Sequence, residues 1–177
     1  GGGKVVEGTA RRKEILRRLQ LAEKPLSASR FAEELGVSRQ IIVGDVALLR
    51  AAGEEIIATS RGYKLDQAKD QKGRTKKIAV QHDASQTQEE LEIIVANGGE
   101  VVDVIVEHEI YGELVGSLRI KTAKDVKDFI KNYRNSNARL LSNLTNGIHL
   151  HTIRYQTEAD FQQIKQALAE KGILYQE

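Results

Sequence analysis

The chain contains no cysteine, and this absence limits the chemistry that it can carry. Disulfide bonds and thiolate metal sites are both excluded, so any bound metal must use nitrogen and oxygen ligands. No apolar run approaches the roughly 18 residues of a membrane-spanning helix, and the first residues show no apolar stretch typical of a signal peptide. We therefore expect a cytoplasmic protein that makes no contact with membranes.

The small net charge of +2 conceals an uneven distribution. Residues 1–77 hold 17 Lys and Arg against 10 Asp and Glu, whereas residues 78–177 hold 10 against 15. A basic first half followed by an acidic second half indicates that the first half contacts nucleic acid. With 177 residues the chain is long enough for one large domain or two small ones.

The first half is typical of a DNA-reading module. Apolar residues recur at helical spacing in three segments, and each segment is preceded by a candidate N-cap, namely Thr9, Ser27 and Ser38. Gly36 is a candidate C-cap between the second and third helices, and residues 54–65 have the pattern of a β-hairpin. Three helices followed by a hairpin predict a winged helix-turn-helix domain.

The third helix of such a domain enters the major groove of DNA, with its N-terminal turns nearest the bases. Its inward stripe is predicted to be Ile42, Val46 and Leu49. At 100° per residue, the opposite face then carries Gln40, Gly44 and Ala47. We expect this second face to be the one that approaches DNA, with Gly44 allowing a close approach of the backbone.

Four residues are candidates for DNA binding, namely Ser38, Arg39, Gln40 and Arg61. Gln40 is suited to pairing with adenine, and Arg39 to guanine or phosphate. Arg61 is predicted at the tip of the hairpin, where it reaches phosphate or the minor groove. A three-helix domain used only for protein contacts is the alternative.

The second half predicts an α+β domain. Residues 66–77 contain no apolar residue larger than alanine and are predicted to form a linker. Strand-like and helix-like stretches follow it; the strands are expected within 77–82, 100–120, 147–155 and 173–176, and the helices within 85–97, 122–135 and 157–172. The predicted architecture is a winged helix-turn-helix domain over 1–65 joined to an α/β sandwich-like domain over 78–177, with a mostly antiparallel sheet.

Three of the four histidines fall at strand positions in this second half. His149 and His151 stand two residues apart, so both rings point to the same face of a strand. His82 ends an earlier strand and Glu90 lies near the start of the next helix, so both can converge on the same point. Three imidazoles and a carboxylate suit a borderline divalent metal such as zinc, nickel, cobalt or iron. Such an ion leaves room for water or a small ligand.

Each of these residues also has a structural alternative. Glu90 stands three residues after Thr87, which is the spacing of a capping box. An isolated His82 is more often hydrogen-bonded than metal-bound. His108 precedes a predicted turn and is a further ligand, a partner of the ligands, or a contact for a bound molecule together with Tyr111.

The combination of motifs resembles bacterial niacin-responsive transcriptional repressors, which join a winged helix domain to a 3H (three-histidine) domain. The motifs are "SRQIIVGDVALLRAAG", "IIATSRGYKL", "VQHD", "VEHEIYGEL" and "NGIHLHTI", and the resemblance runs from about Arg11 to Tyr175. It implies a repressor of genes for uptake and synthesis of NAD precursors. The positions that match metal ligands of the family are His82, Glu90, His149 and His151. The family usually has proline after the middle histidine, where this chain has Glu109.

We therefore expect a DNA-binding regulator and not an enzyme. The resemblance implies nicotinic acid or a close relative as corepressor, with His108 and Tyr111 as candidate contacts, and a divalent transition metal, nickel or zinc. Because one winged domain reads one half-site, we expect a homodimer on double-stranded operator DNA. Two alternatives stay open: the metal itself is the signal, or a metal hydrolase is fused to the DNA-binding domain.

Overall fold

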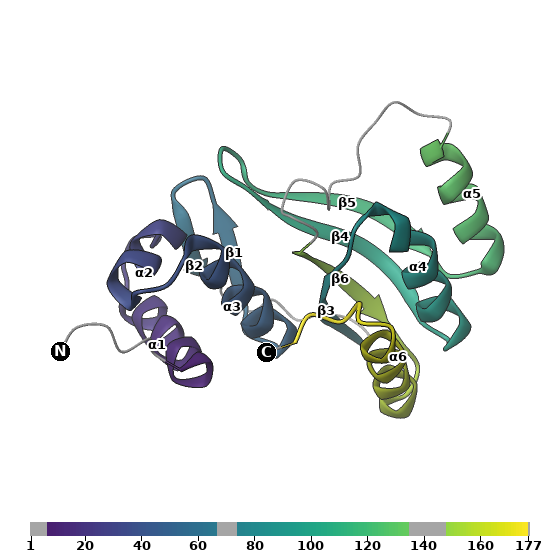
Figure 1. Cartoon of the computed structure of the whole chain (residues 1–177), viewed down its shortest axis with the longest axis horizontal. Coiled ribbons are helices and arrows are strands. Elements are labelled where there is room, and N and C mark those ends of the chain that lie inside the picture. Colours follow the sequence, from purple (N-terminus) through teal and green to yellow (C-terminus); the bar gives the residue numbers. More distant parts are fainter. Residues whose placement is uncertain (1–6, 67–73, 135–147, 177) are drawn as a thin grey trace.

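The structure is a computed structural model that describes residues 7–66, 74–134 and 148–176. Its N-terminal unit is a three-helix module with a two-stranded antiparallel wing (Figure 1). The elements are α1 (Gly8–Leu21), α2 (Ala28–Leu35), α3 (Arg39–Ala51), β1 (Ile56–Thr59) and β2 (Gly62–Leu65). The order of a winged helix-turn-helix domain is therefore confirmed.

Local hydrogen bonds explain where these helices begin. Ser27 accepts from the amide of Arg30, and Ser38 accepts from the amide of Ile41, both at 3.1 Å, so both predicted N-caps are confirmed. The prediction for Thr9 is wrong. The N-cap is Glu7, two residues earlier, and its carboxylate accepts from the amide of Thr9 and so satisfies that free donor.

The N-terminal unit has its own apolar core, which gathers Ile15, Leu19, Phe31, Ile42, Val46 and Tyr63 from all three helices and the wing. An ion pair joins α1 to α3 beside this core. Asp45 on α3 is buried, and its carboxylate lies 2.5 Å from Arg11 Nε and 3.2 Å from Arg12 Nη1. Because a buried carboxylate is costly without cationic partners, this pair fixes the two helices relative to each other.

The C-terminal unit is a four-stranded antiparallel sheet in the order β3-β6-β4-β5, with three longer helices. Its elements are β3 (Thr75–Gln81), the 3-10 turn η1 (Ala84–Gln86), α4 (Thr87–Ala96), β4 (Glu100–His108), β5 (Gly112–Ile120), α5 (Ala123–Arg134), β6 (Ile148–Arg154) and α6 (Glu158–Glu170). Figure 1 places α4, α5 and α6 together, at the end of the molecule away from the winged unit. The predicted α+β class is confirmed.

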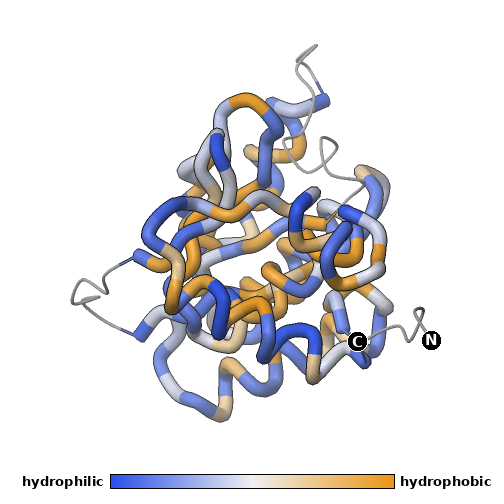
Figure 2. Tube along the Cα trace, turned by 90° about the vertical axis from the view of Figure 1, so that its left-hand side faces the viewer, coloured by the Kyte–Doolittle hydropathy of each residue, from blue (hydrophilic) through white to orange (hydrophobic). Residues whose placement is uncertain are grey.

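The two faces of this sheet pack against different partners. One face meets α4, α5 and α6 in a core that includes Ile78, Ile153 and Phe161. The opposite face meets α3 through a smaller apolar cluster that contains Ala47, Ile105 and Leu150. The apolar residues accordingly run through the interior of the trace in Figure 2, while the turns at its periphery are mostly hydrophilic.

Two boundaries differ from the predicted ones. Strand β3 begins at Thr75, within the segment predicted as a linker, of which residues 67–73 lie outside the described part of the chain. The segment 173–176 makes a single bridge, between Leu174 and Val80, and does not form a strand. Among the described residues, no helix combines the length and apolar character needed to cross a membrane.

The turn between α2 and α3 requires a glycine. Gly36 has a φ of +73°, and its amide closes the end of α2 by donating to Ala32. We expect Gly36→Ala to lower the free energy of unfolding by roughly 1–2 kcal/mol, because a side chain disfavours this left-handed conformation. Urea denaturation would measure the loss. Glu33→Ala, on the exposed surface of the same helix, is the control and should change stability by less than about 0.5 kcal/mol.

Candidate metal centre and DNA-reading helix

Four polar side chains converge between the sheet and the start of α4. His82 directly follows β3, Glu90 lies on α4, and His149 and His151 lie on β6. All four are buried, with exposed fractions of 6%, 1%, 4% and 3% in that order. The rings of His149 and His151 share one face of the strand, as predicted, and their Nε2 atoms are 3.2 Å apart.

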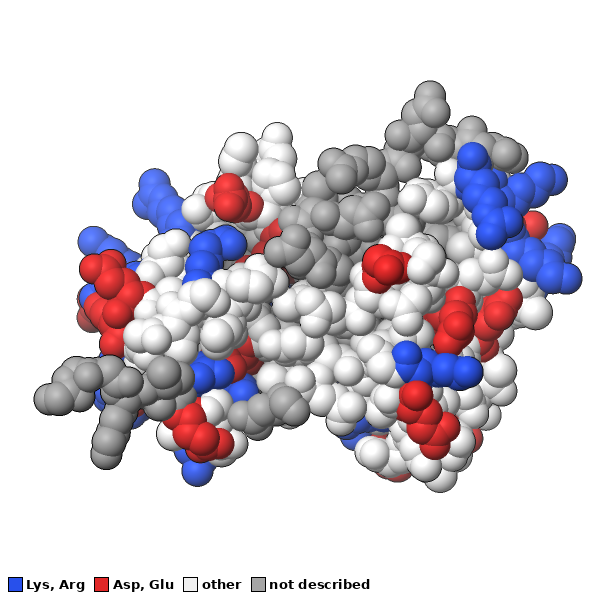
Figure 3. Space-filling model, viewed as in Figure 1, with Lys and Arg blue, Asp and Glu red and all other residues white. Residues whose placement is uncertain are grey.

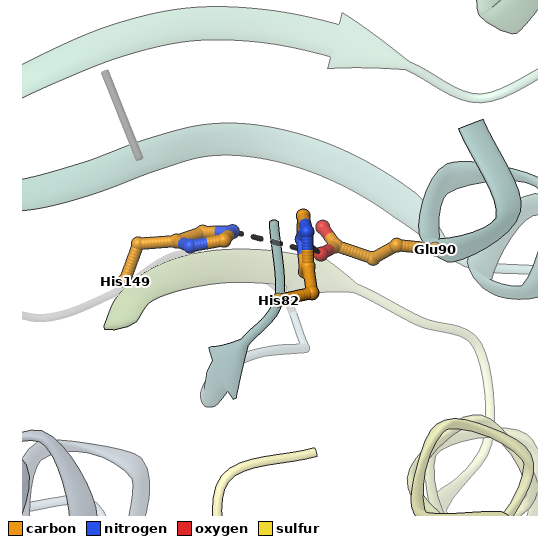
Figure 4. Close-up of side chains that lie close together, drawn as sticks. All are labelled: His82, Glu90 and His149. Carbon is orange, nitrogen blue, oxygen red and sulfur yellow. Dashed lines mark ion pairs between the residues drawn. The ribbon is translucent and has the colours of Figure 1, made fainter. Parts of the chain in front are cut away.

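The three imidazoles present the same atom to the carboxylate. Nε2 of His82 contacts Oε2 of Glu90, Nε2 of His151 contacts Oε1, and Nε2 of His149 lies 3.6 Å from Oε2. Figure 4 shows the carboxylate of Glu90 directed at the ring of His82, with the ring of His149 approaching from β6. The set therefore has three nitrogen donors that face the two oxygens of one carboxylate.

Backbone carbonyls orient two of the rings by bonding Nδ1, the ring nitrogen that does not face Glu90. Nδ1 of His82 donates to the carbonyl of Asp83 at 2.7 Å, and Nδ1 of His151 donates to the carbonyl of Asp103 at 2.8 Å. With its Nδ1 proton held in this way, each neutral ring has its Nε2 lone pair directed toward the centre. Metal-ligating histidines are typically held by such outer hydrogen bonds.

The donor set fits a divalent cation. Donor atoms of His82, Glu90 and His149 lie within 4.8 Å of one another, so this buried group could hold a metal ion. His82 Nε2 and Glu90 Oε2 are buried; they contact each other as an ion pair, and neither makes a hydrogen bond within the described part of the chain. Buried polar atoms normally have partners, and a cation would satisfy both of these. Nitrogen and carboxylate donors suit borderline transition metals.

The same contacts shift the pKa values of the four groups. Burial alone would raise the pKa of Glu90, but the three histidines around it hold that pKa well below its usual value. Burial opposes the charged forms of His82 and His151, yet contact with Glu90 raises the pKa of both. For His149 burial prevails and lowers the pKa, which favours the neutral ring that binds a metal.

The capping-box interpretation of Glu90 is wrong. Thr87 is already the first residue of α4, and the N-cap is Gln86, whose side chain makes no capping bond. Glu90 is turned inward toward the histidines, so its carboxylate does not close the end of the helix.

His108 and Tyr111 lie in the hairpin that joins β4 to β5. Nδ1 of His108 accepts from the amides of Ile110 at 3.1 Å and Tyr111 at 3.3 Å, and the two rings pack with centroids 4.8 Å apart. His108 also lines a pocket of about 310 Å³ between this hairpin and the wing. Arg39, Arg61 and Glu107 line the same pocket. The role predicted for His108 and Tyr111, contact with an effector, stays a prediction.

The four candidate DNA-binding residues lie around the start of α3 and the tip of the wing. Ser38 caps α3, Arg39 is exposed in its first turn, and Gln40 is half-buried. Arg61 is exposed at the turn between β1 and β2. On the face shown in Figure 3, basic side chains on the winged unit are interleaved with acidic ones, and a second basic group lies over α5, so charge does not mark one DNA-binding surface on this face.

The expectation that Gly44 and Ala47 lie on an open DNA-facing surface is wrong for this arrangement. Both are buried against the C-terminal unit. Sequence reasoning missed this interface because it depends on residues far apart in the chain. Two of its polar contacts are Tyr63 Oη donating to Glu107 at 2.6 Å, and Arg50 Nη1 donating to Glu113 at 3.0 Å. Burial raises the pKa of Glu107 to about 7.

The metal-free centre should make stability depend on pH. Folding raises the pKa values of His82 and His151. Their ionic contact with Glu90 therefore stabilises the fold fully below pH 6.5, the ordinary pKa of histidine. This stabilisation is lost as the pH rises through the pKa values of the folded state. We expect Glu90→Gln to cost about 3–5 kcal/mol at pH 6 and clearly less at pH 9, measured by urea denaturation with chelator present. Glu89→Gln, an exposed neighbour, is the control. Equal losses at both pH values would contradict this assignment of charge.

Comparison with known proteins agrees with this architecture. Residues 75–177 match the 3H domain family, and residues 11–64 match a helix-turn-helix domain family. The chain is 41% identical over 167 residues to the probable transcription repressor NiaR of Thermotoga maritima, and 43% identical over 169 residues to the transcription repressor NadR of Bacillus subtilis. In both cases 94% of each chain is covered. These relatives are regulators and not enzymes, and this chain belongs to the same family of transcription repressors, which join a helix-turn-helix domain to a 3H domain.

Proposed function

We propose that the chain represses genes for niacin uptake and NAD synthesis, with nicotinic acid or a close relative as corepressor and a divalent transition metal in the 3H domain. The support for niacin is the resemblance of the five motifs to niacin-responsive repressors. The proposed metal site is supported by the buried group of three Nε2 atoms around the carboxylate of Glu90. Nickel or zinc is the ion that we propose, because imidazole and carboxylate donors suit borderline divalent metals.

His82, Glu90, His149 and His151 would hold the ion. The ion would supply a fixed positive charge and a further coordination position for water or for a nitrogen or oxygen atom of the effector. The four side chains come from the end of β3, from α4 and from β6. Their shared ligand would therefore fix two strands and a helix relative to one another.

The winged domain would bind operator DNA in the cytoplasm. Arg39, exposed in the first turn of α3, would reach a base edge or a phosphate, and Ser38 would cap the start of the helix that presents it. Gln40 follows Arg39, but its amide nitrogen is buried, so this side chain would have to turn outward to pair with a base. Arg61, at the tip of the wing, would contact the backbone or the minor groove. Two copies of the chain would place two such domains on half-sites one or more helical turns apart.

Metal binding is tested by calorimetric titration of nickel or zinc into the chelator-stripped chain. We expect one ion per chain, with release of protons, because the histidine ligands must be neutral. His82→Ala and His149→Ala should each lower the affinity by more than about 100-fold, since losing only an outer partner of a ligand costs about 10–100-fold. His108→Ala is the matched control and should bind metal like the wild type. Unchanged affinity in the first two variants would remove these residues from the ligand set.

The corepressor is tested on a DNA duplex enriched from a random library by the full chain. We expect nicotinic acid to tighten binding about 100-fold, which lies within the usual range of coupling between two sites, and chelation to abolish this response. Fluorescence anisotropy at fixed salt would measure the affinity, because binding to DNA depends strongly on salt. Full tightening by the metal alone would make the metal the signal, and no effect of nicotinic acid would refute the niacin assignment.

A further inference from the structure

Both broad faces of α3 are occupied by protein. Ile42, Val46 and Leu49 pack into the core of the winged unit. The opposite face carries Gly44 and Ala47, and this face packs against the sheet of the 3H domain. The first turn of α3 remains accessible, because Arg39 is exposed and Ile41 is 41% exposed there. Further along the helix, Leu48 is partly exposed.

The closest approach is at Gly44. A Cβ atom built on this residue would lie 2.0 Å from the hydroxyl oxygen of Tyr175, and hence in severe overlap. Tyr175 belongs to the segment after α6, and its amide donates to the carbonyl of Ala79 in β3, so it is held on the edge of the sheet. Glycine inside a helix costs roughly 0.5–1 kcal/mol relative to alanine. Contact with Tyr175 gives a structural reason for glycine at this position.

Polar contacts extend this interface to the wing. One carboxylate oxygen of Glu113 accepts from Arg50 Nη1 on α3 and from the amide of Ala58 on β1, at 3.0 and 3.1 Å. Arg50 is buried, and its ion pair with Glu113 offsets the cost of burying its charge. Gly112 lies against the backbone of Thr59, where a Cβ atom would approach to 2.4 Å. The 3H domain therefore contacts both α3 and the wing, the two elements that the proposed function assigns to DNA.

We propose that this arrangement is autoinhibited: the 3H sheet covers the face of α3 that must enter the major groove, and DNA binding requires the two units to separate. The major groove is about 12 Å wide and an α-helix with its side chains about 10–12 Å across, so the groove accepts the helix but not the helix with a sheet on it. This inference rests on the proposed binding of operator DNA by α3. It assigns Tyr175 and Glu113 to the regulation of that helix.

Because the chain contains no cysteine, a single introduced thiol can report whether the 3H sheet shields this face of α3 from solvent. In Ala47→Cys the new thiol is the only one, and it lies at a position that is 6% exposed beneath the sheet. We expect it to react with a maleimide as slowly as Ala32→Cys, whose position is buried in the core of the winged unit itself. Leu21→Cys, at a 71% exposed position, gives the rate of an open site. A rate for Ala47→Cys close to that of Leu21→Cys would overturn the proposal.

Two substitutions in the 3H domain should favour separation of its sheet from α3. We expect Tyr175→Ala or Glu113→Ala, added to Ala47→Cys, to speed its labelling about tenfold, while the same substitutions leave the rate of Ala32→Cys unchanged. In a background without the reporter thiol, both should tighten binding to the selected DNA duplex about tenfold with neither nicotinic acid nor metal added. Tyr133→Ala, on α5, is the control and should change neither measurement.

The outcomes separate this proposal from the proposed function. Faster labelling of Ala47→Cys without tighter DNA binding would show that the units separate but that the cover does not inhibit, and the proposal would fall. If no variant bound DNA, the proposed function would fail and the inhibitory role with it, although a protected thiol would still report the closed arrangement. Faster labelling and tighter binding together, in both variants, would support autoinhibition.

Discussion

The structure depends on β6 being buried on both of its faces. Side chains alternate along a strand, so neighbouring residues of β6 enter different environments. His149 and His151 face Glu90 on α4, whereas Ile148 and Leu150 face the cluster that contains Ala47 of α3. One short strand thus lies between the candidate metal centre and α3. Any displacement of β6 toward a bound ion moves the surface on which α3 rests.

The candidate centre also shows how a full charge can be kept inside a small domain. The carboxylate of Glu90 is 1% exposed, and a buried carboxylate needs cationic or hydrogen-bonding partners. Three histidines surround it, and the carbonyls of Asp83 and Asp103 orient two of them. A metal ion would replace the proton-dependent charge of these rings with a permanent one. Without metal, the fold relies on protonation of His82 and His151, which ties its stability to pH.

Local patterns in the sequence were enough to predict much of the fold and of the centre. Ser27 and Ser38 form caps through bonds that span three residues, and the common direction of His149 and His151 follows from the period of a strand. Glu90 was harder, because its spacing from Thr87 equally suited a capping box. Packing against the histidines decides its role, and that depends on tertiary structure.

The relation between the two units could not be predicted in the same way. Helical spacing correctly placed Gly44 and Ala47 opposite the core of the winged domain, but it carries no information on what covers that face. The covering residues, Tyr175 and Leu150, stand more than a hundred positions later in the chain. Periodicity describes which side of an element is apolar, whereas contacts between distant elements depend on the whole topology.

Gly44 has a consequence for how such a protein can change. A longer side chain at this position would give α3 a new group with which to choose among base pairs, but it would also collide with the hydroxyl of Tyr175. Operator preference and the balance between the two arrangements of the chain therefore cannot be adjusted independently at this site. A lineage that adopts new target genes by altering residue 44 must also alter residue 175.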